Sequence, residues 1–332
     1  MAQAAGEDEQ PDRYGGGELL EAFEAQIAQL LGKEAAVFMP SGTMAQQIAL
    51  RIHADRSGSG NVALHPQSHL IVSENNAAQM LHGLQPLPAG QRDSLYTLED
   101  LQSLTDPLAA VLMELPERNI GGALRPWNDV EAICTWARER NVAIHLDGAR
   151  LFECAPHYGM DLQAMAAPFD TVYVSFYKIL NAIAGAALAG PKSFVDEARA
   201  WQWRHGGRLI QQYPMVVSAR EGLQRWLPRI PLYCERAREI AALLEGFEDT
   251  FVTPSPPQTN MFHVYVRGDR ERLQDAAAVI ARENDLRILP VWNKTEIPGF
   301  AMSELTCAEG ALEIPDGEVR EAFARLLREA RS

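Results

Sequence analysis

The sequence predicts an α/β fold in which a mostly parallel β-sheet carries helices on both faces and a smaller α+β domain follows. Short aliphatic runs alternate with amphipathic helical segments from Glu18 to about Phe194, and the pattern changes after about Arg229. A chain of 332 residues with 47% hydrophobic content is also longer than one compact domain. We therefore expect a disordered acidic tail over residues 1–12, a large domain over 13–228 and a small domain over 229–332.

The large domain reads as alternating helices and strands. Helices are expected over residues 17–32, closed by Gly32, over 41–55, opened by Ser41, and over 127–141. The expected strands are residues 35–40, 61–66, 108–116, 142–147, 171–176 and 185–190. In the small domain we expect long helices over 232–247 and 316–330, a helix between the first two strands, and strands over 259–266, 286–292 and 301–307.

Composition favours a small-molecule partner. The formal net charge of -14 argues against a nucleic-acid or anionic-membrane partner. The polar, acidic N-terminus is unlike a signal peptide, and no apolar run reaches the roughly 18 residues of a membrane helix. The cysteines show neither CxxC nor His-rich spacing, so we expect no disulfide framework, no metal site and a cytoplasmic location; they are Cys134, Cys154, Cys234 and Cys307.

Hydroxyl and glycine residues stand where the first expected strand gives way to a helix. Ser41, Gly42 and Thr43 would place free N–H groups and the positive end of the helix dipole at one point, which is a favourable seat for a phosphate. An ordinary serine N-cap without a ligand explains the same residues equally well.

Two charged residues at later strand ends suggest what such a phosphate could belong to. Asp147 ends one strand and could face a protonated pyridine nitrogen, although a local salt bridge with Arg150 is the simpler alternative. Lys178 follows the next strand in apolar surroundings, where a neutral amine could form an imine with an aldehyde, unless it is a lysine that extends to solvent. Phosphate, basic ring nitrogen and aldehyde occur together in pyridoxal 5'-phosphate (PLP).

His69 lies beyond another expected strand. Its imidazole could stack on the pyridine ring or transfer a proton, and a buried histidine with a purely structural role is the alternative. His65, four residues earlier, is the weaker candidate.

At this point the chain resembles the threonine aldolase and β-eliminating lyase family of fold-type I PLP enzymes. The matching stretches are DRYGGGELLEAFE, LGKEAAVFMPSGTMAQQ, SHL, the glycines at 121 and 122, HLDGARLFE, SFYK and QTNMF. The resemblance implies a seven-stranded sheet and a homodimer or homotetramer with the site near the subunit interface. It also implies these roles: Ser41, Gly42 and Thr43 bind phosphate, His69 stacks on the ring, Asp147 holds its nitrogen, Lys178 forms the imine and Arg150 binds the substrate carboxylate.

The chain departs from the family pattern in four places. It lacks the N-terminal Arg-Ser-Asp-Thr stretch, and Glu117 stands where the family carries a catalytic histidine. The stretch over residues 298–300 lacks the late carboxylate-binding arginine, and Ile179 replaces a glycine after the lysine. Arg208 is a weak replacement candidate for binding the substrate carboxylate.

The expected activity is retro-aldol cleavage of a β-hydroxy-α-amino acid to glycine and an aldehyde, with His69 or Glu117 as the base. β-Elimination, which would give an oxo acid and ammonia, is the alternative, and a non-catalytic ligand-binding module is a third possibility. Which bond breaks depends on which substituent of the α-carbon stands perpendicular to the ring, and the sequence does not fix that angle.

Overall fold

The computed structural model describes residues 9–284 and 288–331, and the chain divides into two compact units. The large unit runs to Asn119 and takes in Arg125–Pro228, whereas the small unit combines Ile120–Leu124 with the chain from Arg229 onward. The sequence placed residues 120–124 in the large domain. They belong to the small unit because the backbone N–H of Leu124 donates to the Gln258 side chain at 2.7 Å.

The expected tail is only partly within the described residues, since positions 1–8 lie outside them. Residues 9–12 are attached to the large unit rather than loose. The carboxylate of Asp12 is buried and accepts hydrogen bonds from the backbone N–H groups of Gln212 and Tyr213, both at 2.7 Å. Glu9 forms an ion pair with Arg220. These contacts hold residues 9–12 in place, whereas the sequence analysis expected the ordered chain to begin at residue 13.

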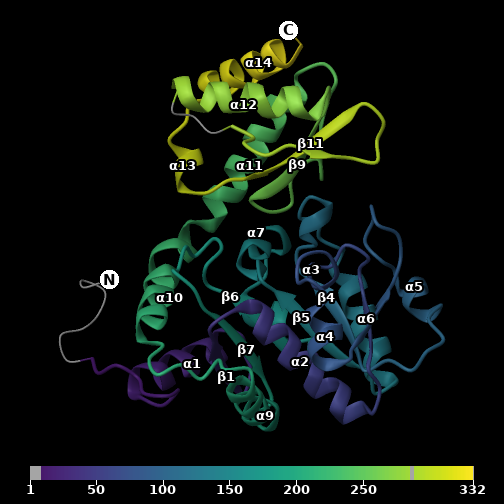
Figure 1. Cartoon of the computed structure of the whole chain (residues 1–332), viewed down its shortest axis with the longest axis vertical. Helices are drawn as coiled ribbons and strands as arrows, with labels where there is room; N and C mark the ends of the chain where they lie inside the picture. Colours follow the sequence, from purple (N-terminus) through teal and green to yellow (C-terminus); the bar gives the residue numbers. More distant parts are fainter. Residues whose placement is uncertain (1–8, 285–287, 332) are drawn as a thin grey trace. The chain divides into compact units, whose positions relative to one another are not determined.

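The large unit is built on the predicted seven-stranded, mostly parallel sheet (Figure 1). Its spatial order is β1-β7-β6-β5-β4-β2-β3, and only β7 is antiparallel to its neighbours. A loop joins β6 to β7 with no helix between them, so β7 returns in the opposite direction. The strands are β1 (Ala35–Met39), β2 (Asn61–Leu64), β3 (Gln85–Pro88), β4 (Ala110–Glu114), β5 (Ala143–Gly148), β6 (Thr171–Ser175) and β7 (Ala186–Gly190).

Both faces of this sheet are covered because alternate strand residues point to opposite sides. On one face, Val37 and Met39 of β1 join a buried cluster with residues of α2 (Gly42–Ser57) and α9 (Lys192–Arg204). On the other face, Phe38 packs edge-on against Phe23 of α1 (Glu18–Leu30), with ring centroids 6.1 Å apart. The sheet is therefore the middle layer of three.

Shorter helices complete the large unit. They are α3 (His69–Val72), α4 (Ala77–His82), α5 (Leu98–Gln102), α6 (Trp127–Glu139), α7 (Ala155–Tyr158), α8 (Leu162–Ala166) and α10 (Tyr213–Trp226). Most of them occupy the crossover connections that parallel strands require. As a result, the carboxyl ends of β2, β4, β5 and β6 meet at one edge of the sheet.

The small unit carries an antiparallel sheet of order β10-β11-β9-β8. Its strands are β8 (Thr250–Thr253), β9 (Met261–Arg267), β10 (Asn293–Lys294) and β11 (Phe300–Thr306), and its longer helices are α11 (Ile230–Glu245), α12 (Arg270–Asn284) and α14 (Asp316–Arg331). Of the strand expected over 286–292, residues 286 and 287 lie outside the described residues. Residues 288–292 form no strand, because Ile288, Leu289 and Trp292 are buried in the core instead of pairing in the sheet.

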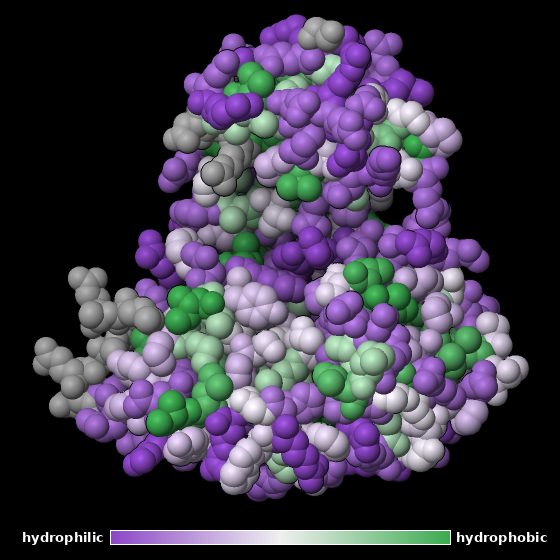
Figure 2. Space-filling model, viewed as in Figure 1, coloured by the Kyte–Doolittle hydropathy of each residue, from purple (hydrophilic) through white to green (hydrophobic). Residues whose placement is uncertain are grey.

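The visible surface is mostly hydrophilic, with separate hydrophobic patches on it (Figure 2). In the large unit the exposed apolar side chains include Met80, Leu81, Ile183, Trp203 and Ile210. Among the described helices, none is both long enough and apolar enough to cross a membrane.

Candidate active site

A cavity in the large unit collects side chains from the carboxyl ends of four strands. It is lined by His69, Glu114, Pro116, Arg118, Asn119, Asp147, Ala149, Arg150 and Lys178. In open α/β sheets, ligands bind at this edge. The sequence had placed His69, Asp147, Arg150 and Lys178 at strand ends, and the structure brings these four together.

Lys178 lies in the turn that follows β6 and is largely withdrawn from solvent. Burial lowers the pKa of its amine, while the carboxylate of Asp147 acts in the opposite direction. Within the described part of the chain, no hydrogen bond or ion pair engages the amine. An unpartnered amine with a lowered pKa spends more time neutral, which is the form that attacks a carbonyl carbon.

Asp147 lies at the end of β5 and is 5% exposed. Burial raises the pKa of its carboxyl, and the positive charge of Lys178 is the largest opposing influence. One oxygen accepts a hydrogen bond from the backbone N–H of Ala149 at 3.0 Å. Among the described residues, Arg150 makes its ion pair with Glu153, at 4.0 Å, and not with Asp147. The local salt bridge considered for Asp147 is therefore absent from this part of the chain.

His69 begins α3 and its ring is held by a buried carboxylate. Its Nδ1 lies 3.1 Å from Oε1 of Glu74, whose other oxygen accepts a hydrogen bond from Gln47 at 3.2 Å. The hydrogen bond to Glu74 raises the pKa of His69, and burial opposes the rise. The backbone N–H of His69 also donates to Oε1 of Glu114 at 2.8 Å. Both contacts fix where the imidazole lies within the cavity.

The Ser41–Thr43 segment forms the start of α2, as expected. The Ser41 hydroxyl accepts a hydrogen bond from the backbone N–H of Met44 at 3.3 Å, so the ordinary N-cap is present. Gly42 has no space for a side chain, since a Cβ there would lie 1.9 Å from the hydroxyl oxygen of Tyr173. The backbone at Gly42 thus packs directly against the tyrosine side chain that β6 projects.

Glu117 is 2% exposed and is not one of the residues that line the cavity. Burial, and then the adjacent carboxyl of Glu114, raise its pKa well above the ordinary value. His65 is buried beside it, with Nδ1 3.7 Å from Oε1 of Glu117. That nitrogen accepts a hydrogen bond from the backbone N–H of Gln67, and Nε2 donates to the carbonyl of Ser94. His65 is therefore a neutral, structural histidine.

Arg208 is exposed, and the structure places it outside the cavity lining. Its guanidinium stacks over the ring of Trp203, 4.3 Å from the centroid, and donates to the backbone carbonyl of Tyr14. Within this chain, Arg208 is committed to those two residues.

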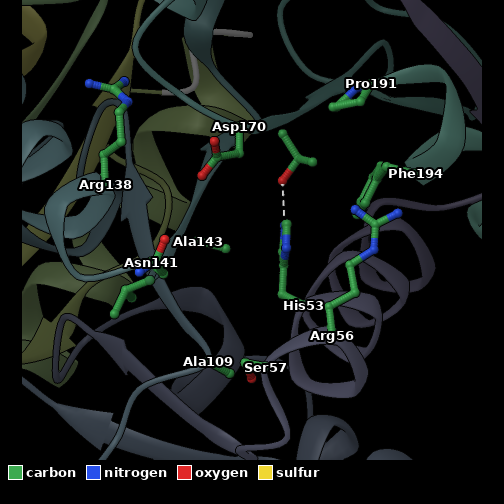
Figure 3. Close-up of a pocket in the computed structure, with 12 residues that line it drawn as sticks. His53, Arg56, Ser57, Ala109, Arg138, Asn141, Ala143, Asp170, Pro191 and Phe194 are labelled. Atoms are coloured by element: carbon green, nitrogen blue, oxygen red, sulfur yellow. Dashed lines mark hydrogen bonds between the residues drawn. The ribbon is translucent and has the colours of Figure 1, made fainter.

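A second cavity, of about 380 Å³, lies at the opposite edge of the sheet, where β5 and β6 begin (Figure 3). Its polar groups pair with the protein: His53 bonds Thr171 at 2.8 Å, and Arg56 bonds Glu197 at 2.6 Å. The Asp170 carboxylate accepts from a backbone N–H at 2.7 Å. Burial lowers the pKa of His53 to about 4, so the ring stays neutral. These groups stabilise the fold and leave the first cavity as the candidate active site.

Comparison with known proteins shows the family to which the chain belongs. The family model for β-eliminating lyases matches residues 1–268, most of the chain. The chain belongs to this family. A candidate L-allo-threonine aldolase from Listeria monocytogenes is 38% identical, with a TM-score of 0.94 and coverage of 99% of this chain and 92% of that one. The architecture is that of fold-type I PLP enzymes, as the resemblance implied.

Two further proteins are similar to this chain. A candidate aromatic amino acid β-eliminating lyase/threonine aldolase from Exiguobacterium is 36% identical, with a TM-score of 0.93 and coverage of 99% of this chain and 93% of the other. Low-specificity L-threonine aldolase 1 of Arabidopsis thaliana is 28% identical over 87% of this chain and 86% of its own length.

Sequence reasoning missed several buried carboxyl groups in and around this cavity. Glu114 ends an apolar strand as Asp147 does, so the rule that selected Asp147 would also have selected it. Glu74 and Glu153 gave no such signal. Both lie within irregular or short helical segments, where spacing alone does not show that a carboxylate is buried. Burial raises the pKa of Glu153 to about 7, although the charge of Arg150 opposes the rise.

Proposed function

We propose that the protein is a PLP-dependent lyase that cleaves a β-hydroxy-α-amino acid to glycine and an aldehyde. The observation that carries this proposal is the amine of Lys178, which lines one cavity with Asp147 and His69 and has no hydrogen-bond or ion-pair partner among the described residues. Relatives named as threonine aldolases support the substrate class.

The residues present fit PLP. The partly buried amine of Lys178, whose pKa is lowered, suits its aldehyde carbon, and the buried carboxylate of Asp147 suits a protonated ring nitrogen. The close backbone at Gly42 and the first N–H groups of α2 suit a phosphate, with Ser41 and Thr43 adding hydroxyls. When bound, PLP withdraws electrons from the α-carbon of an amino acid and so labilises its bonds.

The other polar residues of the cavity supply binding and proton transfer. Arg150 places a guanidinium in the lining and suits the substrate carboxylate, which it can bind through two parallel hydrogen bonds. His69, which Glu74 orients, suits stacking on the cofactor ring and proton transfer. Glu117 remains a candidate base, because a carboxyl whose pKa burial has raised accepts protons better near neutral pH. Arg208 would serve the substrate only from another conformation or another subunit.

β-Elimination is the second candidate reaction, since the same family includes β-eliminating lyases. It would remove the α-proton and a β-substituent instead of breaking the Cα–Cβ bond. The two reactions use the same cofactor-binding residues and differ in which substituent the cavity orients. Identifying the reaction products therefore distinguishes retro-aldol cleavage from β-elimination better than substituting the cofactor-binding residues does.

The test is to incubate the holoenzyme with phenylserine, threonine, β-chloroalanine and an S-alkyl cysteine and to identify the products. Glycine and the matching aldehyde from the hydroxy acids are the expected result. An oxo acid and ammonia from β-chloroalanine and the S-alkyl cysteine, with no glycine from any compound, would assign β-elimination instead. A visible absorption band of the bound cofactor that does not change with any amino acid would favour a non-catalytic module.

We also propose that the protein works in the cytoplasm as a homodimer or homotetramer. The four cysteines are buried, and no disulfide joins them within the described residues, which suits a reducing compartment. Exposed apolar side chains on the large unit, including Trp203 and Ile210, suit burial against a second copy. Light scattering coupled to size-exclusion chromatography should give a multiple of the 36.7 kDa chain mass. A single-chain mass at micromolar concentration would contradict the oligomer.

A further inference from the structure

Two buried carboxyl groups stand together at the end of β4. Glu114 is the last residue of the strand and lines the cavity, while Glu117 lies three residues later, buried and outside the lining. Burial, and then the carboxyl of Glu114, raise the pKa of Glu117, so the two groups interact. Two interacting carboxyl groups that are both withdrawn from water favour a single negative charge, with one proton held by the pair.

The groups around Glu114 and Glu117 stabilise one negative charge on the pair but not two. Glu114 receives the backbone N–H of His69 at 2.8 Å, a contact that a carboxylate oxygen accepts. Its Cα pairs with that of Asp147 on β5, which brings a third carboxyl close by. The other titratable and charged groups around the pair include Arg118, Arg150 and Lys178 in the cavity lining, His69 and His65 beyond β2, and Tyr96 and Arg125.

The cation that opposes the rise in the pKa of Glu117 is Arg125, and its side chain is held in place. Arg125 is buried, donates to the backbone carbonyl of Tyr96 at 2.8 Å and stacks 4.4 Å from the centroid of the Tyr96 ring. Neutral His65 adds no positive charge, because its Nδ1 is occupied as an acceptor.

We propose that Glu114 and Glu117 act as one acid–base pair, in which Glu114 meets the substrate β-hydroxyl and Glu117 holds the proton that keeps the pair at a single negative charge. This inference rests on the proposed retro-aldol function. The β-hydroxyl proton passes to Glu114 as the Cα–Cβ bond breaks and the aldehyde C=O bond forms. The electron pair stays with the α-carbon, and return of a proton to that carbon gives glycine and restores the pair. Glu114 is then the catalytic residue and Glu117 a positioning residue.

The kinetic test compares Glu114→Gln and Glu117→Gln with the surface control Glu139→Gln, whose side chain is 68% exposed. We expect Glu114→Gln to lose at least ~100-fold in kcat/KM for phenylserine. Glu117→Gln should lose at least ~10-fold in kcat/KM. The acid limb of its kcat/KM–pH profile should move to lower pH by roughly one unit, because the glutamine amide donates a hydrogen bond to an ionised Glu114. Glu117→Asp, which keeps an ionisable carboxyl, should recover most of the activity.

A second measurement does not depend on turnover. A carboxyl whose pKa is raised by folding stabilises the protein below its ordinary pKa, and that stabilisation is lost as the pH rises through the raised value, about 7 for Glu114. The melting temperature of Glu117→Gln relative to wild type should therefore increase by at least ~2 °C between pH 5.5 and 8. Glu139→Gln should show no such change.

The outcomes separate the two proposals. Glycine formation by the wild type together with an unchanged pH profile and pH-independent melting difference in Glu117→Gln would overturn the pair and leave the lyase function standing. Near wild-type activity in Glu114→Gln would overturn its catalytic role. If no hydroxy acid gives glycine, the lyase function fails, and the melting difference alone decides whether the carboxyls share a proton. If Glu117→Gln does not fold, Glu114→Gln provides the same melting comparison.

Discussion

Asp147, near the end of β5, and Lys178, just after β6, come from neighbouring strands of the large sheet, and each opposes the effect of burial on the pKa of the other. Burial raises the pKa of the Asp147 carboxyl and the lysine charge opposes that rise. Burial lowers the pKa of the Lys178 amine and the aspartate charge opposes that fall. A ligand that uses the amine as an imine would leave Asp147 in need of another cation, and a protonated ring nitrogen supplies one.

The first prediction concerns which lysine carries the cofactor. The chain has four lysines, Lys33, Lys178, Lys192 and Lys294, so peptide mapping after borohydride reduction has few alternatives to separate. We expect the reduced cofactor on the peptide that contains Lys178, and none in Lys178→Ala. Lys192→Ala is the control, since its amine pairs with Asp196 on the surface at 2.8 Å. Label on the Lys33 or Lys294 peptide of the wild type would refute the assignment.

The second prediction separates the charge of Asp147 from its shape. Asp147→Asn keeps the volume and removes the negative charge, so turnover should fall at least ~100-fold while the cofactor remains bound through other contacts. Asp147→Ala should do the same and also bind the cofactor more weakly. Single-turnover kinetics and cofactor titration measure the two effects separately. Turnover close to wild type in Asp147→Asn would mean that no charge is needed at this position.

The third prediction concerns the histidine that Glu74 orients. The hydrogen bond to Glu74 raises the pKa of His69, so Glu74→Gln should lower that pKa toward or below its ordinary value. NMR titration of histidine-labelled protein can follow the change directly. The raised pKa also means that this pair stabilises the fold fully below the ordinary histidine pKa, and that the contribution disappears as the pH rises through the raised value. A pKa unchanged in Glu74→Gln would show that another group orients the ring.

The sequence predicted six of the seven strands of the central sheet, missing β3 (Gln85–Pro88), and four of the residues at its ligand-binding edge. Apolar strands alternate with amphipathic helices, and the first polar residue after a strand reaches the edge regardless of what folds around it. That rule found Asp147, Lys178 and His69. Glu117 was placed in the site on the family resemblance alone, whereas the structure has Glu114, and not Glu117, in the cavity lining. A strand shows which residues point inward, but whether a loop carboxylate is buried depends on contacts from distant segments.

The same limit applies to Arg208 and to the segment Ile120–Leu124. Arg208 lies in a glycine-containing basic stretch, and nothing in that stretch shows that its guanidinium stacks on Trp203 instead of reaching the cavity. The segment Ile120–Leu124 lies within the large domain in sequence and joins the small unit through Gln258, which is 134 residues away from Leu124. Long-range partners of this kind leave no trace in local periodicity.

The last prediction tests the close backbone at the start of α2. In Gly42→Ala the new methyl carbon would stand 1.9 Å from the hydroxyl oxygen of Tyr173 and 2.9 Å from that of Tyr177. Tyr173 is buried and cannot turn aside without disturbing β6, so we expect a loss of about 1–3 kcal/mol in stability. The control is Gly317→Ala, where nothing lies within 4 Å of the added carbon. Because Gly317 lies in α14, alanine there should be neutral or stabilising. Thermal unfolding of both variants and of the wild type measures these effects. A melting temperature of Gly42→Ala equal to that of the wild type would mean that Tyr173 moves aside without loss of stability. A lower melting temperature for Gly42→Ala alone, together with weaker cofactor binding, would support the proposal that this turn holds the phosphate.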